Sequence, residues 1–301
     1  MKIRIGTRGS ELAMWQARFV AGLLGTHRTE IIVIKTQGDA IQNLSFDKME
    51  GKGFFTREIE QALLDKTIDL AVHSLKDLPT ENPPGLIIAA VPEREDPSDR
   101  LLVSPGAWDK RKDLCMREGA VVGTSSMRRM AQLRLMRRDL IIEPLRGNVN
   151  TRVRRLREGR FDAIVMAAAA IRRIDLAVDD LMCVQLETDV FIPAPAQGAL
   201  GLQVREGDAE TLRAVAPLNH PGTERAVSAE RAFLRLFGGG CHIPLGALAE
   251  IEAGGALLLR GIVAATDGSS AFRDEVIDTD PEKAGARLAR LLQEQGADRL
   301  L

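Results

Sequence analysis

The sequence has little of what several protein classes require. Only three of its 301 residues are cysteines, and they stand far apart at Cys115, Cys183 and Cys241. Because they form neither a Cys-x-x-Cys pair nor a zinc-ligand spacing, we expect free thiols in a reducing compartment and no metal. No apolar run is long enough to cross a bilayer. The chain starts directly with a strand pattern and without a signal-peptide apolar region, which predicts a cytoplasmic protein that has no membrane partner.

An excess of charge of one sign is also missing. The 41 Lys and Arg residues nearly balance 42 Asp and Glu residues, which leaves a formal net charge of -1. Proteins that coat nucleic acid are usually basic overall, so we expect no nucleic-acid partner. A hydrophobic content of 45% and a charged content of 28% are typical of a soluble globular protein. Nothing in the sequence indicates an oligomer, and we expect a monomer.

The first two-thirds of the chain alternates apolar runs with helical patterns. Ser10 is a candidate N-cap for a helix that reaches about Leu24. A second helix is predicted over Phe54–Lys66, and the polar segment Ile41–Gly53 before it is predicted to be a loop. Alternation of this kind favours parallel sheets covered by helices. The first helix has an apolar stripe of Leu12, Trp15, Phe19 and Leu23. The predicted strands are Lys2–Gly6, Ile31–Thr36, Ile68–His73 and Leu86–Val91.

A charged segment, Glu93–Asp99, interrupts this pattern, and a fresh α/β unit follows it. That unit has predicted strands near Leu101, Ala120, Leu140 and Phe161, with a helix over Met127–Arg138. A second break falls around Leu186–Pro195, before a strand at Leu200–Val204. The simplest topology is a chain that leaves its first domain, builds a second, and returns, with a cleft between the two domains.

The last third of the chain is organised differently. A helix over Thr223–Phe237 ends at three glycines, and a helix over Pro281–Gln295 closes the chain. Strands grouped before one helix predict a small α+β domain. The three strands are predicted at Leu245–Ile251, Ala256–Ala265 and Ala271–Asp278.

Four arginines follow directly after predicted strands: Arg128, Arg129, Arg146 and Arg152. Ligands of open α/β sheets bind just past the carboxyl ends of strands, and arginine grips carboxylate or phosphate with a planar pair of donors. Two like charges about 4 Å apart repel by about 4 kcal/mol at an effective dielectric constant of 20. A cluster of arginines in one cleft is therefore costly unless an anion fills it, which indicates a polyanionic ligand. The other arginines up to Arg160 are better explained as a solvated helix face.

For three further residues, the local sequence allows both a functional and a purely structural interpretation. Asp77 ends a buried strand and can stabilise positive charge in a substrate, although Asp before Leu-Pro is also ordinary turn chemistry. Arg8 stands where a strand meets a helix, either in an anion site or on the surface. Cys241 lies among glycines, either as an exposed thiol or as a small buried residue. His73 is predicted to be packed inside its strand.

Eight short motifs occur in order along nearly the whole chain. Each motif alone is a weak indication of a protein family, but the ordered set is highly specific. The set resembles the porphobilinogen deaminases, also called hydroxymethylbilane synthases. The stretches are Thr7–Ser10, Gly51–Phe55, Val72–Pro79, Glu93–Pro97, Val122–Arg129, Leu145–Asn148, Pro195–Ala199 and Gly239–Cys241. Departures are small: Arg57 stands where related sequences often have lysine, and Pro195-Ala196 stands where some have valine-glycine before Gln197.

The resemblance implies three domains: residues 1–93 with 190–214, residues 94–189, and residues 215–301. The first two would be doubly wound and similar to periplasmic binding proteins, and the third would be the α+β domain. It also implies a transferase of haem and other tetrapyrrole biosynthesis. Four porphobilinogen molecules would join head to tail, each losing ammonia, on a dipyrromethane cofactor held by Cys241 through a thioether. Hydrolysis would then release hydroxymethylbilane.

Carried onto this sequence, the resemblance assigns the catalytic role to Asp77 and the binding of acetate and propionate groups to the cationic and polar residues of the motifs. The binding residues are Arg8, Ser10, Lys52, Ser74, Lys76, Thr124, Ser125, Ser126, Arg128, Arg129, Arg146, Gly147, Asn148, Arg152 and Gln197. The main rival is a cytoplasmic anion-binding protein with the same cleft, which explains the arginines but not an exposed cysteine in a third domain. A nucleic-acid interface over Arg128–Arg160 would predict steeply salt-dependent binding.

Overall fold

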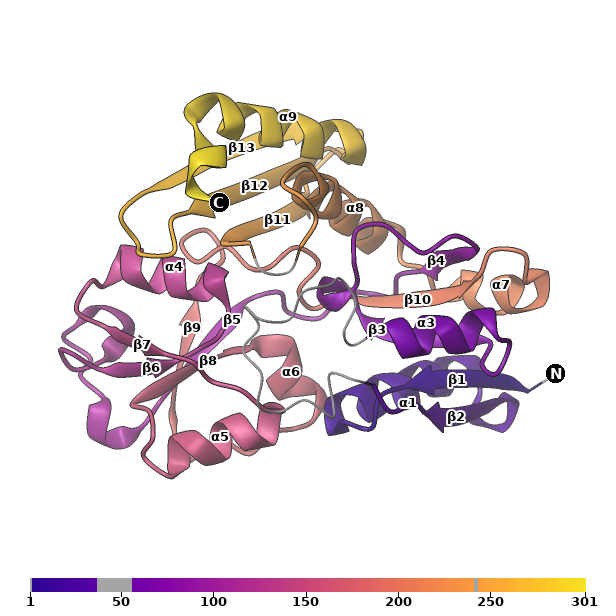
Figure 1. Cartoon of the computed structure of the whole chain (residues 1–301), viewed down its shortest axis with the longest axis horizontal. Helices are drawn as coiled ribbons and strands as arrows, with labels where there is room; N and C mark the ends of the chain where they lie inside the picture. Colours follow the sequence, from indigo (N-terminus) through magenta and orange to yellow (C-terminus); the bar gives the residue numbers. More distant parts are fainter. Residues whose placement is uncertain (1, 37–55, 241–242) are drawn as a thin grey trace. The chain divides into compact units, whose positions relative to one another are not determined.

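The computed structural model describes residues 2–36, 56–240 and 243–301, which pack as two compact units. The first unit runs to Glu95 and resumes over Gly198–Arg225, and the second comprises Asp96–Gln197 and Ala226–Leu301. The chain therefore leaves one unit and later returns to it, as the two breaks in the sequence pattern predict. Three sheets form the framework of these units (Figure 1). The division into three domains stays a prediction.

The sheet of the first unit has five strands in the order β2-β1-β3-β10-β4. Strands β1, β2 and β3 are parallel, whereas β10 runs antiparallel to both of its neighbours, β3 and β4. The predicted parallel pairing is found for β1, β2 and β3, whereas β10, which the chain forms on its return, enters in the opposite direction. The strands are β1 Ile3–Thr7, β2 Thr29–Val33, β3 Leu70–Ser74, β4 Leu86–Ala90 and β10 Leu200–Arg205.

Helix α1, Glu11–Leu24, covers one face of this sheet, and helix α3, Arg57–Leu64, covers the other. Ser10 caps α1 as predicted, but the predicted apolar stripe is not its buried face. Phe19 and Leu23 are exposed, while Trp15 stacks on Phe19 at 5.3 Å between ring centroids. The side that faces the sheet includes Ala17 and Ala21 instead, and small residues of this kind let the helix pack closely. The buried residues of α1 are Gln16, Ala17, Val20 and Ala21.

The second unit contains a sheet with the same plan. Its order is β7-β6-β8-β5-β9, in which β6, β7 and β8 are parallel and β5 is antiparallel to both neighbours. In both sheets the antiparallel strand is the one formed directly after a crossing between units. Strand β9, Met182–Leu186, was not expected from the sequence. The other strands are β5 Asp99–Val103, β6 Val121–Gly123, β7 Ile141–Glu143 and β8 Ala163–Ala167.

Helices fill the connections of both sheets. In the second unit these are α4 Met127–Met136, α5 Val149–Arg157 and α6 Ala168–Arg173, and in the first unit α7 Ala209–Val215 follows β10. Apolar clusters on both faces of each sheet confirm a doubly wound α/β arrangement. The short 3-10 turns are η1 Thr26–Arg28, η3 Leu75–Asp77, η4 Pro105–Ala107, η5 Asp113–Cys115, η6 Ala216–Leu218 and η7 Ala297–Leu300.

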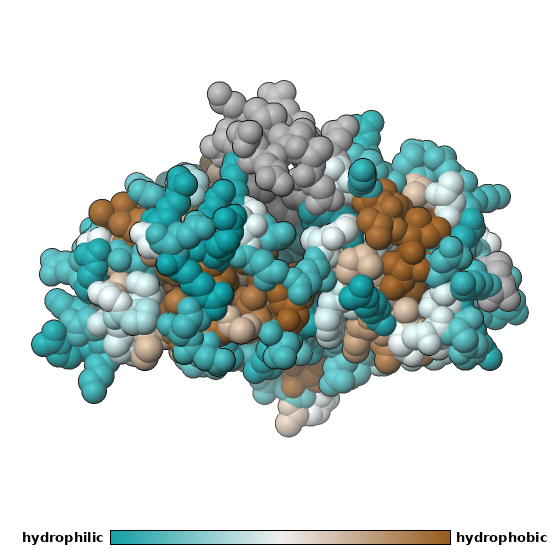
Figure 2. All heavy atoms as spheres, turned by 90° about the horizontal axis from the view of Figure 1, so that it is seen from below, coloured by the Kyte–Doolittle hydropathy of each residue, from teal (hydrophilic) through white to brown (hydrophobic). Residues whose placement is uncertain are grey.

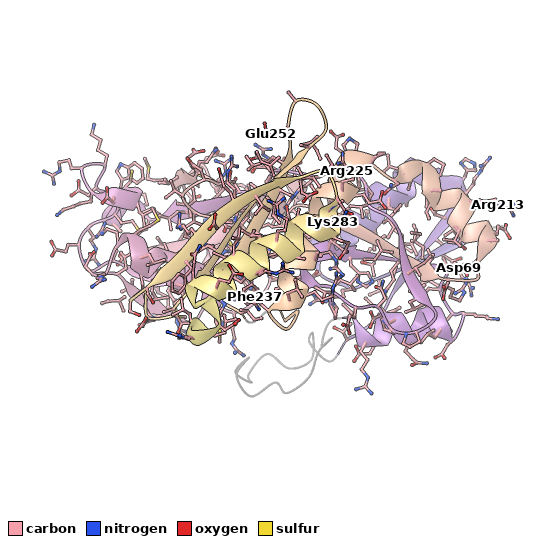
Figure 3. All side chains as sticks on the ribbon, turned by 90° about the horizontal axis from the view of Figure 1, so that it is seen from above. Asp69, Arg213, Arg225, Phe237, Glu252 and Lys283 are labelled. Carbon is pink, nitrogen blue, oxygen red and sulfur yellow. The ribbon has the colours of Figure 1, made fainter. Side chains whose placement is uncertain are left out.

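The C-terminal part is a small antiparallel sheet covered by two helices, as predicted. Its strands β11, β12 and β13 pair in sequence order, and helix α9 lies along them (Figure 3, where Lys283 marks this helix). Ala131 of α4 and Ile262 of β12 belong to one apolar cluster, so this sheet packs on α4 within the second unit. The elements are α8 Pro221–Leu236, β11 Leu245–Ile251, β12 Leu257–Ala264, β13 Ala271–Asp278 and α9 Pro281–Gln295.

Hydrophilic side chains predominate on the face shown in Figure 2, and the hydrophobic patches there are separate. Scattered exposed apolar side chains, such as Leu23 and Ile277, are normal for a folded protein. Among the residues that the structure describes, no helix combines the length and the apolar character needed to span a membrane.

Candidate active site

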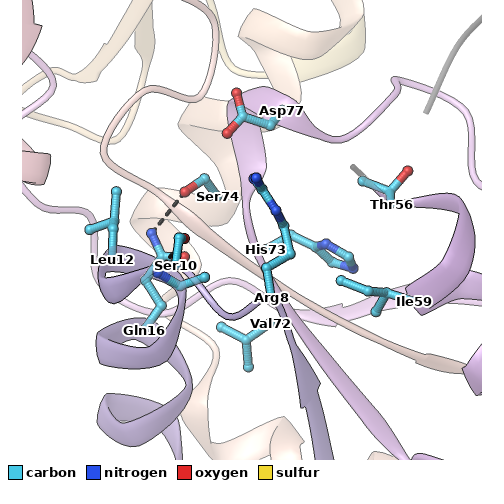
Figure 4. A pocket seen from close by; sticks show the side chains of 11 residues that line it. Arg8, Ser10, Leu12, Gln16, Thr56, Ile59, Val72, His73, Ser74 and Asp77 are labelled. Carbon is cyan, nitrogen blue, oxygen red and sulfur yellow. Dashed lines mark hydrogen bonds between the residues drawn. The ribbon is translucent and has the colours of Figure 1, made fainter. Parts of the chain in front are cut away.

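A pocket opens in the first unit at the carboxyl ends of β1 and β3 (Figure 4). This is the edge at which open α/β sheets bind ligands. The space inside it that the centre of a water molecule can occupy is about 90 Å³. Its walls combine apolar side chains with hydroxyls, a guanidinium, an imidazole and a carboxylate. The lining residues are Arg8, Ser10, Leu12, Ala13, Gln16, Thr56, Ile59, Val72, His73, Ser74 and Asp77.

The first wall of the pocket is the start of α1. The Ser10 hydroxyl accepts a hydrogen bond from the Ala13 amide at 3.4 Å, which caps the helix. A helix N-terminus carries partial positive charge and attracts anions. Arg8 is half-buried beside it, and its side chain points toward the part of the pocket where Asp77 lies (Figure 4). This corner can receive a carboxylate, as the sequence predicts for Arg8 and Ser10.

Asp77 stands on the turn η3 directly after β3. The turn is anchored by two buried side chains, Leu75 and Leu78, and by the Leu75 amide, which donates to the Ala199 carbonyl at 3.0 Å. The Asp77 side chain is exposed at the pocket, and it accepts no hydrogen bond from any residue that the structure describes. The two interpretations of Asp77, as a turn residue and as a functional carboxylate, are therefore compatible, because the turn presents the carboxylate to the pocket. Lys76 precedes it on the same turn and is half-buried.

Ser74 and Gln16 form a pair that the sequence did not reveal. Gln16 is buried on α1 and donates from Nε2 to the Ser74 Oγ at 2.8 Å (Figure 4). Because Ser74 accepts this bond, its own hydroxyl proton remains available to a ligand. The two residues stand 58 positions apart, and only a polar residue on the sheet-facing side of α1 could have signalled the contact.

His73 also lines the pocket and is buried, as predicted. Its Nε2 lies 3.1 Å from the Gln203 Oε1. Burial lowers the pKa of His73 to about 4, against an opposing contribution from this hydrogen bond. The ring is therefore neutral at physiological pH.

A second group of predicted residues lies in the other unit. Arg128 and Arg129 begin α4 and are buried, and each donates an Nη2–H to one oxygen of Asp99, at 2.8 Å and 2.6 Å. Although burial alone raises the pKa of Asp99, the charges of Arg128 and Arg129 outweigh it and hold this pKa well below its usual range. The sequence argument for a costly arginine cluster overlooked Asp99, which offsets part of the charge from inside the protein.

The residues around these arginines shape the start of α4. Ser126 caps α4 by accepting from the Arg129 amide at 3.4 Å, and Thr124 Oγ1 accepts from the Ser126 amide at 3.2 Å. Ser125 donates to the Leu145 carbonyl at 3.0 Å, which ties this loop to the next one. Thr124, Ser125 and Ser126 therefore have structural contacts whatever ligand they meet.

The loop before α5 holds the next predicted residues. Asn148 caps α5 by accepting from the Thr151 amide at 3.0 Å, and Arg152 donates to the Gly147 carbonyl at 2.8 Å. Gly147 has a φ of 107°, a left-handed conformation that favours glycine. Arg146 is half-buried at the same loop. The N-terminus of α5, which carries partial positive charge, follows this loop and makes it a suitable anion site.

Gln197 is fully buried where the chain is about to return to the first unit. Its amide donates to the carbonyls of Pro97 and Ser98, at 2.7 Å and 3.3 Å, and to the Asp99 Oδ1 at 3.0 Å. It therefore links both crossing segments to the Asp99 cluster. Lys52 and Cys241 lie outside the described residues. The helix before Cys241 ends as predicted, with Gly238 and Gly239 both at positive φ.

Two family models together match almost the whole chain. The model described as "Porphobilinogen deaminase, dipyromethane cofactor binding domain" matches residues 3–213, and the one described as "Porphobilinogen deaminase, C-terminal domain" matches residues 225–294. The chain belongs to the porphobilinogen deaminase family. The resemblance drawn from the eight sequence motifs is thereby confirmed, and so is the association with a dipyrromethane cofactor.

Similar proteins align with this chain over nearly their full length. Porphobilinogen deaminase of Syntrophotalea carbinolica is 47% identical, with 99% of this chain and 95% of that protein covered. The enzyme of Syntrophomonas wolfei is 44% identical, with 99% and 97% covered. Among solved structures, an arginine-specific periplasmic binding protein of Salmonella typhimurium has a TM-score of 0.41 at 14% identity, covering 72% of this chain and 91% of its own. The BvgS periplasmic VFT2 domain of Bordetella pertussis has a TM-score of 0.42 at 12% identity, covering 71% and 85%.

Proposed function

We propose that this chain joins four porphobilinogen molecules head to tail, with loss of ammonia, into hydroxymethylbilane, as a cytoplasmic monomer without a nucleic-acid partner. The supporting observation is the pocket at the ends of β1 and β3. It places the exposed carboxylate of Asp77 opposite the anion-binding corner of Arg8 and Ser10. A pyrrole with two carboxylate side chains and a ring that becomes cationic needs both features.

The polar residues present suit a dipyrromethane cofactor, whose pyrroles carry carboxylates. The start of α1 and the capped start of α5 each offer amides and arginine to anions. We propose that Cys241 holds the cofactor through a thioether and that Lys52 and Lys76 assist the arginines. When bound, the cofactor supplies the anchored end to which substrate is joined. Because a thioether sulfur is a poor leaving group, the bond from Cys241 to the cofactor is not broken during the catalytic cycle, and the cysteine serves as an anchor.

Asp77 is proposed as the catalytic residue. When the carbon–nitrogen bond of the aminomethyl group breaks, its electron pair leaves with ammonia and the pyrrole becomes cationic. The charge spreads to the ring N–H, where an anionic carboxylate stabilises it. The Asp77 carboxylate is available for this task because no described side chain occupies it.

We propose that Arg146, Arg152, Ser126, Gly147 and Asn148 bind carboxylates in the second unit. Thr124 and Ser125 shape that loop, and Ser74 donates its hydroxyl proton in the pocket. Arg128 and Arg129 together carry two positive charges against the single charge of Asp99, so the cluster keeps one net positive charge for a ligand. Gln197 holds this cluster in place.

Intact mass spectrometry tests the proposal directly. The protein as purified should carry an added mass of two linked pyrroles, and Cys241→Ser should lack it. Wild-type protein should consume porphobilinogen and release hydroxymethylbilane. An unmodified protein that is fully active would refute the thioether, and a protein that carries no adduct and binds anions without turnover would favour the anion-binding alternative.

A further inference from the structure

A chain of buried polar groups runs behind the pocket, under helix α3. Thr56 Oγ1 donates to the Glu60 Oε2 at 3.3 Å, and Gln203 Nε2 donates to the Glu60 Oε1 at 3.2 Å. Gln203 in turn faces His73 at 3.1 Å. All four residues are at least nine-tenths buried. Thr56 and His73 both line the pocket, so the chain of contacts begins and ends at its wall.

Strand pairing explains how these groups meet. His73 lies opposite Gly201, and Gln203 lies opposite Ala71, in the antiparallel ladder of β3 and β10. Side chains two residues apart share a face of the sheet, so His73 and Gln203 are diagonal neighbours on the α3 face. The small residues at positions 71 and 201 leave room for the amide and the imidazole between the sheet and the helix.

The direction of these hydrogen bonds determines the tautomer of His73. The Gln203 amide nitrogen must face the carboxylate of Glu60, because the opposite orientation would bring two acceptors together. It also lies 3.3 Å from the Asn82 Oδ1. The Gln203 oxygen therefore faces His73, whose Nε2 must carry the proton. Nδ1 is then the acceptor, and it has no partner among the residues that the structure describes.

The surroundings keep this ring neutral. Burial disfavours a charged imidazole. The Glu60 carboxylate is the nearest anion of the network, but the Gln203 amide separates it from the ring.

We propose that His73 is a further substrate-binding residue, whose Nδ1 accepts a hydrogen bond from the aminomethyl ammonium of porphobilinogen. Gln203 and Glu60 are positioning residues that hold the ring in the required tautomer. This inference rests on the proposed function. The N–H donors of the substrate are its ring N–H, assigned above to Asp77, and its ammonium. The carboxylates of the substrate only accept, so an unprotonated Nδ1 cannot bind them.

A neutral acceptor suits this leaving group. The ammonium must keep its three protons until the carbon–nitrogen bond breaks, so that nitrogen departs as neutral ammonia with the bonding electron pair. An imidazole that is hard to protonate orients the ammonium without taking its proton, and no proton passes to His73. The positive charge remains on the pyrrole beside Asp77.

Substrate discrimination provides the test. His73→Phe should lower kcat/KM for porphobilinogen about 10- to 100-fold, because a hydrogen bond to a charged group is lost. For an analogue with hydroxymethyl in place of aminomethyl the loss should be about 2- to 10-fold, since a neutral bond is weaker. His73→Asn, which retains an acceptor near the Nδ1 position, should recover part of the preference. His220→Phe is the matched control, because that ring contacts Thr223 away from the pocket and should leave the ratio unchanged.

Nitrogen NMR of the four histidines tests the tautomer without turnover. In wild-type protein the His73 ring should show a protonated Nε2 and a bare Nδ1, and Gln203→Met should mix the two tautomers. Adding porphobilinogen to the Asp77→Asn variant should shift the Nδ1 signal. A protonated Nδ1, or an equal loss of both substrates in a folded His73→Phe variant, would overturn the inference. Failure of wild-type protein to consume porphobilinogen would instead refute the proposed function.

Discussion

At the scale of single residues, two aspartates have opposite environments. Asp77 is exposed at a pocket and has no hydrogen-bond partner among the described residues, whereas Asp99 is fully buried between two guanidinium groups. Exposure makes the first carboxylate available to a ligand. Asp99 is buried and its charge is balanced by arginine, so it has a structural role. The two aspartates should therefore respond differently to replacement by Asn.

Replacing Asp77 by Asn should leave folding intact and nearly abolish turnover. The change removes a negative charge from the site where the substrate becomes cationic, and the loss of one such electrostatic contact typically costs about 100- to 1000-fold in kcat. Steady-state kinetics together with intact mass check this, because the adduct should still form. Glu81→Gln, at an exposed position in the following loop, is the control. Near-normal rates in Asp77→Asn would remove this residue from the mechanism.

Replacing Asp99 by Asn should destabilise the protein at neutral pH. Removing one partner of a buried ion pair typically costs about 3–5 kcal/mol. The folded-state pKa of Asp99 is depressed, so its contribution is present above the unfolded pKa of about 3.9 and is lost as pH falls below it. Urea unfolding at pH 7 and pH 3 measures this.

The difference in unfolding free energy between wild type and Asp99→Asn should therefore shrink at the lower pH. Asp179→Asn, at an exposed turn, should show no such difference at either pH. An Asp99→Asn protein as stable as wild type at pH 7 would contradict the role assigned to the buried pair.

At the scale of elements, helices pack where small residues allow it. Gly285 of α9 lies against α8, where an added Cβ would come within 2.6 Å of Ala232 Cβ and 2.8 Å of the Ala229 carbonyl oxygen. Gly22 of α1 has nothing within 4 Å of the same position. Both are helical glycines, so propensity alone favours alanine at either site.

The two substitutions should therefore act with opposite signs. Gly285→Ala should lower the free energy of unfolding by about 1–3 kcal/mol, because the added methyl group would overlap with backbone atoms of α8. Gly22→Ala should stabilise by about 0.5–1 kcal/mol. Denaturant unfolding of the two variants compares them directly, and stabilisation by both would show that α8 and α9 are not closely packed at Gly285.

The sequence predicts the positions of helices and strands better than any other feature of the structure. The start of α1 and the bounds of β11, β13 and α9 follow from caps, prolines and periodicity, which are local signals. The predicted stripe of large apolar residues is not the buried face of α1, because Ala17, Val20 and Ala21 pack on the sheet there. Strand β9 was missed because it is an edge strand with mostly exposed side chains.

At the scale of the whole molecule, cofactor loading should raise stability. In the second unit Arg128 and Arg129 face the single charge of Asp99, and the repulsion that remains between the two guanidinium groups falls when a carboxylate binds. Loaded wild-type protein should therefore melt at a higher temperature than Cys241→Ser, as measured by thermal unfolding at low and high salt. Cys183→Ser, at an exposed cysteine of β9, should melt like the wild type. Equal melting temperatures for Cys241→Ser and loaded wild type would contradict the charge argument.

The sequence by itself determined the family, the α/β plan with its two crossings, and the positions of Arg8, Ser10 and Asp77 at strand ends. These depend on motifs and on alternation along the chain, which are local. Only the tertiary structure decided which side chains meet: Gln16 with Ser74, Gln203 with His73, and Asp99 with Arg128 and Arg129. Those partners stand 29 to 130 residues apart, and strand order and register, which no local pattern encodes, bring them together.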